Sequence, residues 1–286
     1  MQKIPLFFGG EIITNEFRSD GFGSQYQQIL FYYVFAEMSN LTFHYSPLTS
    51  MEHNYLNEED YLERKEILMG FKKNLPLFEG DKVLNGSRLA VYDFISNNLN
   101  DFCKTEALKN AKKFFYESQK KETYLDDNFF NVSFHVRRNV KHDSRGVFND
   151  DQMILSCIKA IRKNKFQKPL KIHIVADGLN FIDDNISNFK NIFQGEEIEF
   201  HLENPVETDF CILVFSDVLV MSRSSLSYVA GIISNNTVVY IPFWHPPLPQ
   251  KNWIVIPSFD PEYVYLWFRS ALLQHYKLQT KSKKAS

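Results

Sequence analysis

From residue 129 onward, short apolar runs alternate with stretches of helical periodicity. Strands that alternate with helices of this length predict βαβ units and a parallel sheet. The sequence therefore predicts an α/β fold whose second half is Rossmann-like. The predicted strands are 131–136, 170–176, 197–201, 218–221 and 238–241, and the predicted helices between them are 152–163, 180–193, 208–215 and 224–233.

The first of these strands ends in basic residues. His135 lies at its end, and Arg137 and Arg138 follow. Ligands of parallel sheets bind outside the carboxyl ends of the strands, and a guanidinium group pairs with phosphate through a planar fork. The pattern predicts a phosphate site.

A second segment points to the same edge of the sheet. The strand 218–221 is followed by Ser222-Arg223-Ser224-Ser225 and then by the helix 224–233. Hydroxyl groups and free backbone N–H groups at a helix start bind anions, helped by the positive end of the helix dipole. Two phosphate-binding elements are thus expected side by side.

The chain has 286 residues, which is enough for two lobes. We expect a helix-rich first lobe over 1–128 and the Rossmann-like lobe over 129–255. A C-terminal helix within 256–277 is expected to pack back on the first lobe, and 278–286 to form a flexible basic tail.

Charge and cysteine content exclude several classes of protein. A net charge of −2 gives no electrostatic footprint for nucleic acid. Cys103, Cys157 and Cys211 are odd in number and fit neither a disulfide framework nor a zinc-ligand spacing, which favours a reducing compartment.

No apolar run is long enough for a membrane span or a signal peptide, so we expect a cytoplasmic protein. The basic tail is expected to aid solubility, with weak contact to a membrane surface as the alternative.

Four segments, taken in order, resemble motifs of the fucosyltransferase superfamily, which comprises alpha-1,2, alpha-1,6 and protein-O enzymes. These are Gly21-Phe22-Gly23-Ser24-Gln25 before a helix, His135-Val136-Arg137-Arg138, Ala176-Asp177, and Ser224-Ser225-Leu226-Ser227-Tyr228. The resemblance covers about residues 20 to 240. It implies a two-lobed GT-B fold, GDP-fucose as donor, inversion at the anomeric carbon and no metal.

The resemblance also implies roles for single residues. An arginine of the pair Arg137 and Arg138 would hold the β-phosphate of the donor, with His135 beside it. Ser224 and Ser225 would lie near the pyrophosphate.

In the alpha-1,6 branch an aspartate that reads guanine precedes these serines, and it falls on Asp209. Two departures mark the chain as divergent. Asn139-Val140 follow the arginines where relatives have an acid, and Ser24 stands where the alpha-1,2 enzymes have asparagine.

Glycosyl transfer leaves negative charge on the departing phosphate, which preorganised donors must stabilise. The chain has no Asp-x-Asp triplet for a metal, and Arg137 or Arg138 with a helix N-terminus can take that role. The acceptor hydroxyl also needs a base. Asp143, beside His142, is the candidate, and Glu11 is a weaker one.

Each assignment has a structural alternative. Gly21 and Gly23 either bring backbone N–H groups to the donor or permit a tight turn. His135 could be a core histidine bonded by backbone, Asp209 a helix cap, and Asp177 the end of its strand. Trp244 and His245, in the proline-rich segment 242–249, either stack on an acceptor sugar or plug the space between lobes.

The sequence thus predicts a metal-independent, inverting glycosyltransferase that transfers fucose from GDP-fucose to a glycan hydroxyl, with no cofactor and no nucleic-acid or integral-membrane partner. Two alternatives remain. One is a transferase that uses another nucleotide sugar, and the other is a non-catalytic protein that binds nucleotide or glycan.

Overall fold

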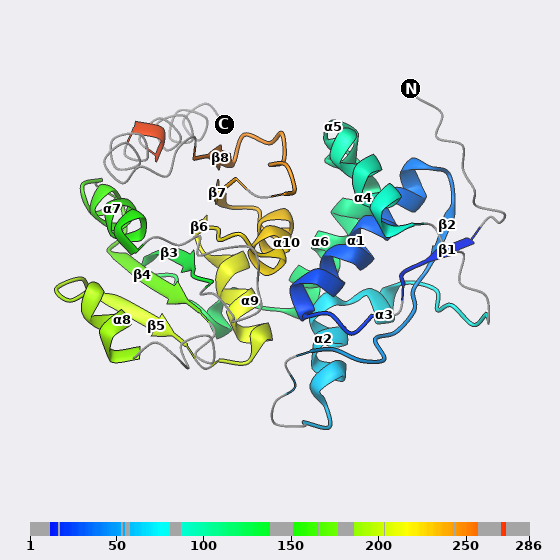
Figure 1. The fold of residues 1–286 in the computed structure, drawn as a ribbon, viewed down its shortest axis with the longest axis horizontal. Helices are drawn as coiled ribbons and strands as arrows, with labels where there is room; N and C mark the ends of the chain where they lie inside the picture. Colours follow the sequence, from blue (N-terminus) through cyan, green and yellow to red (C-terminus); the bar gives the residue numbers. More distant parts are fainter. Residues whose placement is uncertain are drawn as a thin grey trace. The chain divides into compact units, whose positions relative to one another are not determined.

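A computed structural model gives the fold of the chain. It describes residues 12–16, 18–52, 54, 58–80, 87–137, 151–164, 166–176, 186–202, 204–242, 244–256 and 270–272. The chain divides into two compact units, Met1–Lys120 and Lys121–Ser286 (Figure 1). Residues just after Lys120 belong to the second unit, since the ring of Tyr124 stacks on that of Phe215 at 6.1 Å.

The first unit is built around helix α1 (Phe22–Met38), which is buried along most of its length. Its second half is apolar on nearly every side, and three glutamines of its first half are buried as well. Its Glu37 carboxylate accepts the backbone N–H groups of Glu106 and Ala107 at 3.0 and 2.6 Å and so caps a second helix. The other elements are β1 (Ile12–Thr14) and β2 (Thr42–His44), which pair in parallel, and α2 (Tyr61–Met69), α3 (Phe71–Asn74), α4 (Arg88–Asn97), α5 (Leu99–Phe102) and α6 (Glu106–Ser118).

The second unit contains a six-stranded parallel sheet with the order β5-β4-β3-β6-β7-β8. Numbered within this unit, the order is 3-2-1-4-5-6, the doubly wound arrangement of Rossmann folds. The α/β class and the Rossmann-like sheet predicted from the sequence are therefore confirmed. The strands are β3 (Phe130–His135), β4 (Leu170–Val175), β5 (Ile198–His201), β6 (Val218–Val220), β7 (Thr237–Tyr240) and β8 (Trp253–Val255).

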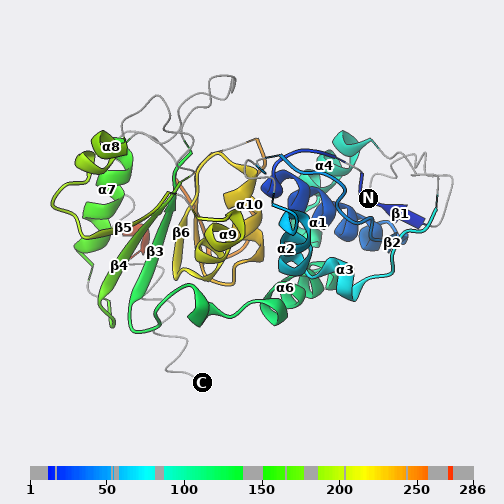
Figure 2. The same cartoon turned by 90° about the horizontal axis from the view of Figure 1, so that it is seen from below.

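Helices cover both faces of this sheet (Figure 2). α7 (Asp151–Arg162) and α8 (Ile186–Ile192) lie on one face, where residues such as Val132, Phe134 and Ile172 form the core with them. α9 (Val206–Phe215) and α10 (Ser225–Ile233) lie on the other face. A 3₁₀ turn, Lys121–Thr123, leads into the unit.

The structure differs from the expectation in several places. β1 and β8 were not expected, and each has three residues. α9 begins at Val206, so Asp209 lies inside the helix and Pro205 takes the N-cap position; the interpretation of Asp209 as a cap is wrong.

Of the predicted C-terminal helix, 270–272 are helical, and Leu272 is buried in the core of the second unit. Its apolar side chain adds to the core on the α7 face of the sheet, and the expected packing of this helix on the first lobe stays a prediction.

Within the described part of the chain, no helix has the length and apolar character needed to cross a bilayer.

Candidate functional site

The two predicted phosphate-binding segments meet in the second unit. β3 and β6 are neighbours, with Phe134 in register with Val220. The chain order of the strands reverses between them, and doubly wound folds bind their ligands at the carboxyl end of such a switch point. His135 ends β3, and the Nδ1 atom of its ring lies 2.7 Å from the Oγ atom of Ser222, just after β6.

The turn after β6 is held by its own serines. The backbone N–H of Ser222 donates to Oγ of Ser227 at 3.2 Å, and that hydroxyl donates to the carbonyl oxygen of Ser222 at 3.1 Å. The N–H of Ser224 also donates to this carbonyl, at 2.9 Å. These bonds fix the start of α10 relative to the end of β6.

Ser224 is the N-cap of α10. Its side chain is buried and accepts the backbone N–H of Leu226 at 3.3 Å. Ser225, the first helical residue, is partly exposed. Of the two predicted serines, Ser224 shapes the helix terminus, while Ser225 lies where a bound anion would meet the positive end of the helix dipole.

His135 is 8% exposed and stays uncharged near neutral pH. Burial, and then the positive charge of Arg137, lower the pKa of its imidazole to about 3. The partner of Nδ1 of His135 is the side chain of Ser222. The alternative of a core histidine bonded by backbone does not explain this bond. Arg137 is half-buried two residues further on.

Asp209 is buried in the first turn of α9 and accepts the side-chain amide of Asn204 at 3.1 Å. The same Nδ2 atom lies 3.2 Å from Nδ1 of His201, at the end of β5. Asp209 is thus tied to the end of a strand of the sheet. No sequence pattern marks Asn204, because its role depends on contacts with two other elements.

Trp244 and His245 have different environments. Trp244 is 55% exposed and donates its indole N–H to Nε2 of His245 at 3.0 Å. His245 is buried, with its ring 5.1 Å from that of Tyr228. Of the two, Trp244 is the one exposed enough for a sugar ring to reach.

Gly21 and Gly23 belong to the first unit, at the start of α1. Gly21 is the N-cap with φ −63° and Gly23 lies in the first helical turn, so neither needs the left-handed conformation that only glycine adopts easily. The side-chain amide of Gln25 donates to the carbonyl oxygens of Asp20 and Ser50, at 2.7 and 2.9 Å, and fixes this turn.

Several predicted residues lie outside the described part of the chain. They are Arg138, Asp143 and Asp177, together with His142 and Glu11.

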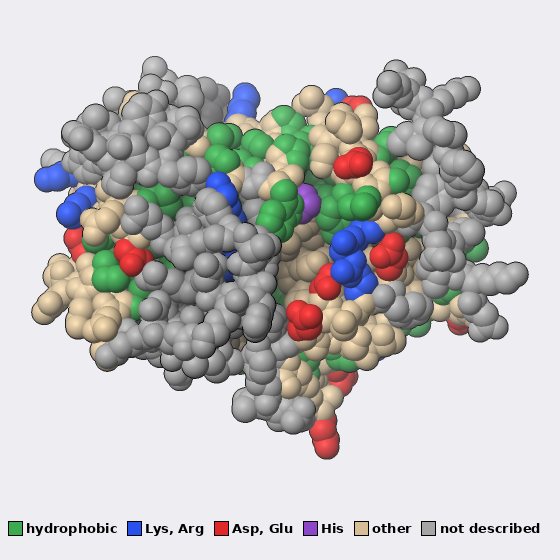
Figure 3. Space-filling model, in the orientation of Figure 1, with side chains coloured by type: hydrophobic (Ala, Val, Ile, Leu, Met, Phe, Trp, Pro, Cys, Tyr) green, Lys and Arg blue, Asp and Glu red, His purple; other side chains and the backbone are tan. Residues whose placement is uncertain are grey.

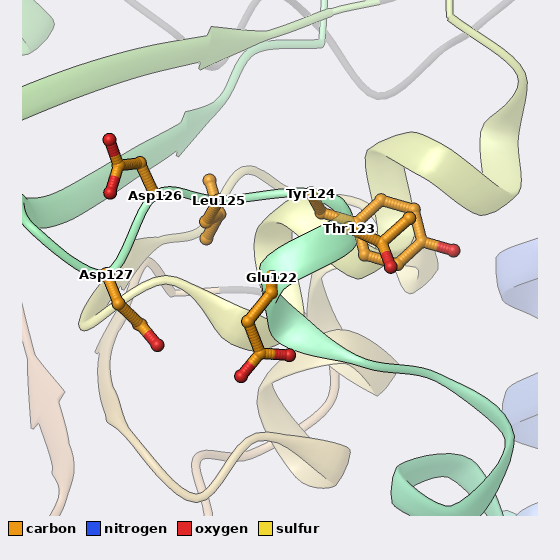
Figure 4. A pocket seen from close by; sticks show the side chains of 6 residues that line it. All are labelled: Glu122, Thr123, Tyr124, Leu125, Asp126 and Asp127. Carbon is orange, nitrogen blue, oxygen red and sulfur yellow. The ribbon is translucent and has the colours of Figure 1, made fainter.

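A surface hollow lies elsewhere on the second unit. Its lining comes from one segment, Glu122 to Asp127, which leads into the amino end of β3 (Figure 4). Asp127 pairs there with Lys121 at 2.8 Å, and this hydrogen bond lowers the pKa of its carboxyl group. Since β3 leads from this hollow to His135, the hollow is at the opposite end of the strand from the candidate site.

Charges of both signs are mixed on the first unit (Figure 3). Asp20, for example, pairs with Arg18 at 2.5 Å and lies 3.7 Å from Arg88.

No protein-family model and no curated protein matches this chain. Among solved structures, the chain is similar to the fucosyltransferase NodZ from Bradyrhizobium, at 12% identity and a TM-score of 0.45, over 78% of this chain and 93% of that one. It is also similar to E. coli heptosyltransferase WaaC with ADP-2-deoxy-2-fluoro heptose, at 12% identity and a TM-score of 0.43, over 94% and 99%. A third is E. coli ADP-heptose LPS heptosyltransferase II, at 10% identity and a TM-score of 0.43, over 93% and 100%. Likenesses this distant do not by themselves assign an activity.

Proposed function

We propose that this chain is a glycosyltransferase that binds a nucleoside diphosphate sugar at the carboxyl ends of β3 and β6. The observation that carries the proposal is the hydrogen bond between His135, at the end of β3, and Ser222, just before α10, at the switch point of a doubly wound sheet. Arg137 follows His135 by two residues. This is the place where such folds bind nucleotides.

The chemistry of these groups suits a pyrophosphate. Arg137 supplies a permanent positive charge, and α10 supplies backbone N–H groups at its positive end. His135 adds a hydrogen-bonding group that is neutral near pH 7. Because it is uncharged, it does not compete with Arg137 for the negative charge of the phosphate. Together they would stabilise charge on the leaving β-phosphate, which is the demand that the transition state makes.

The finer assignment follows the resemblance to the fucosyltransferase superfamily. It gives a GT-B transferase that uses GDP-fucose, inverts the anomeric carbon and needs no metal for transfer. Asp209 would read guanine, Arg138 would share the phosphate with Arg137, and Asp143 would act as base.

Donor and acceptor are the remaining partners of this function. Gly21 and Gly23 would approach the donor, and Asp177 would contact it beside the strand end. A glycan acceptor would use Trp244, whose exposed ring can stack on a pyranose, with His245 supporting it. The reaction would take place in the cytoplasm.

The test is a thermal-shift titration with GDP, UDP, ADP and CMP, with and without EDTA. A ligand that binds the native state raises the melting temperature with its affinity. We expect GDP to stabilise the protein both with and without EDTA, and Arg137→Ala or Arg138→Ala to abolish the shift. Arg64→Ala is the control. It removes an ion-paired surface arginine of the first unit and should leave the shift caused by GDP unchanged.

Other outcomes separate the alternatives. Stabilisation by UDP or ADP instead of GDP would keep the transferase and replace its donor. Binding of GDP without transfer or hydrolysis would indicate a binding protein. A folded protein that responds to no nucleotide would contradict the proposal.

A further inference from the structure

Three potential metal ligands converge on the α9 face of the sheet. His173 belongs to β4, and Glu199 and His201 belong to β5. His173 is in register with Glu199, and alternate residues of a strand share a face, so all three side chains point the same way. Nδ1 of His173 lies 3.0 Å from Nε2 of His201, and each of these nitrogens lies 3.8 Å from an oxygen of Glu199.

We propose that His173, Glu199 and His201 bind a divalent transition-metal ion, with zinc as the first to test. Zinc takes imidazole nitrogen and carboxylate oxygen at about 2.0 to 2.2 Å, which places tetrahedral ligand atoms about 3.3 Å apart. The three separations lie on either side of that value. Shifts of about half an ångström in the side chains would therefore complete the triangle.

The carboxylate is well placed between the two rings. Oε2 of Glu199 faces His173 and Oε1 faces His201, so either oxygen can turn to the ion. Two histidines and one glutamate leave a fourth position for water, as in open zinc sites. The side chain of Glu199 is 45% exposed, which gives an ion a path from solvent.

The hydrogen bonds around His173 fix its tautomer. Nδ2 of Asn131 donates to the carbonyl oxygens of Asp126 and Phe129, at 3.0 and 3.2 Å, so Oδ1 of Asn131 faces the histidine. This oxygen lies 3.0 Å from Nε2 of His173, which must then carry the proton. The lone pair on Nδ1 consequently points into the triangle, and an oxygen on the far ring nitrogen is the usual support of a metal-bound histidine.

His201 must change its tautomer when the ion binds. The amide of Asn204 donates to Nδ1 of His201, so without metal the proton is on Nε2 and bridges to His173. With metal on Nε2 this proton moves to Nδ1, and the amide of Asn204 turns its oxygen toward it. The ring remains neutral throughout. When the amide of Asn204 turns, its N–H no longer donates to Asp209. Binding of the ion therefore changes the hydrogen bonding of Asp209.

Lys171 competes with the ion. Its Nζ atom binds Oε2 of Glu199 at 2.6 Å, on the oxygen nearest His173. Its side chain is 35% exposed and can extend into solvent. Removing this ammonium group should make metal binding tighter, an effect that an ordinary hydrogen-bond network would not show.

The test is titration of EDTA-stripped, full-length protein with zinc against a chromophoric chelator. The wild type should bind one zinc ion, and cobalt in its place should give the visible absorption of a four-coordinate site. Glu199→Gln and His201→Gln should each weaken binding more than about tenfold. Lys171→Gln should tighten it severalfold, and His44→Gln, in the first unit, is the control that should leave it unchanged.

A folded wild type that binds no stoichiometric zinc would overturn the proposal, as would Glu199→Gln binding zinc as tightly as wild type. Unchanged zinc affinity in Lys171→Gln would also count against it. The proposal does not depend on the activity proposed above. Since the phosphate-binding groups follow β3 and β6, nucleotide titrations of metal-free protein test that activity separately.

Discussion

The imidazole of His135 and the hydroxyl of Ser222 lie 2.7 Å apart, although 87 residues separate them in the chain. This hydrogen bond joins the ends of β3 and β6 at the switch point of the sheet. Arg137 lies two residues after His135, and α10 begins three residues after Ser222. The bond therefore ties together the two segments that are predicted to bind phosphate.

Ser222→Ala should destabilise the protein by about 1 to 3 kcal/mol. The substitution leaves a buried ring nitrogen without this partner, and the cost is the desolvation of that group. Urea unfolding measures the change. Ser50→Ala is the control, because its hydroxyl bonds a carbonyl oxygen at an exposed position. Equal stability of the two variants would show that the bond to His135 is not formed in solution.

Stability should fall as the pH is lowered from about 6.5 toward 4. The pKa of His135 is lowered to about 3 by burial and by Arg137, and that of His173 to about 4 by burial and by His201. In this window the unfolded histidines bind protons that the folded ones do not, so acid favours unfolding. Each histidine contributes a slope of up to about 1.4 kcal/mol per pH unit.

His135→Gln isolates one of these contributions. The variant removes the titration from both states, so its stability should depend on pH less steeply than that of wild type over the same range. Parallel curves for the two proteins would contradict the assignment of a neutral, buried His135.

Gly231→Ala should destabilise the second unit by about 1 kcal/mol. A Cβ atom at this position in α10 would lie 3.1 Å from Val238 and 3.2 Å from Trp253, in β7 and β8. The stability gained when alanine replaces glycine in a helix is smaller than the usual cost of overpacking a core. Trp253→Phe removes the ring atoms involved, so the double variant should recover part of the loss. An additive double variant would contradict this packing.

Glu37→Ala should destabilise the first unit by about 1 kcal/mol. The carboxylate accepts two backbone N–H groups at the start of α6 and adds negative charge where the helix dipole favours it. Chemical unfolding followed by circular dichroism measures the loss. Glu117→Ala, near the other end of α6, removes only a surface carboxylate 3.6 Å from Lys113 and should change stability little.

Sequence periodicity predicted the second unit well, because buried parallel strands and their helices have strong local patterns. It missed Trp253–Val255 and Ile12–Thr14, since a three-residue strand carries too little periodicity unless it lies within a strand–helix alternation, as Val218–Val220 does. The continuous apolar run of the sequence begins only at Ile29, although α1 begins at Phe22. Gln25, Gln27 and Gln28 are polar but buried, and the bonds of Gln25 to Asp20 and Ser50 are tertiary contacts.

In the candidate site, the sequence pointed to positions that follow a strand end, such as His135 and Arg137, and their role in binding phosphate is a proposal. The cluster of His173, Glu199 and His201 was not, because it depends on the register between β4 and β5. The polar residues at alternate positions in Lys171-Ile172-His173 and Glu199-Phe200-His201 were the available signal. Such alternation on a strand indicates that one face is polar.

The most direct test of the proposed phosphate site compares a nucleoside diphosphate with its nucleoside by isothermal titration calorimetry, starting with GDP and guanosine. Because Arg137 and the start of α10 would contact only the phosphates, GDP should bind more than tenfold tighter than guanosine, about 1.4 kcal/mol or more. Arg137→Ala should remove most of that difference while leaving guanosine affinity unchanged. Equal affinity of the wild type for both ligands, or an unchanged difference in Arg137→Ala, would contradict the account.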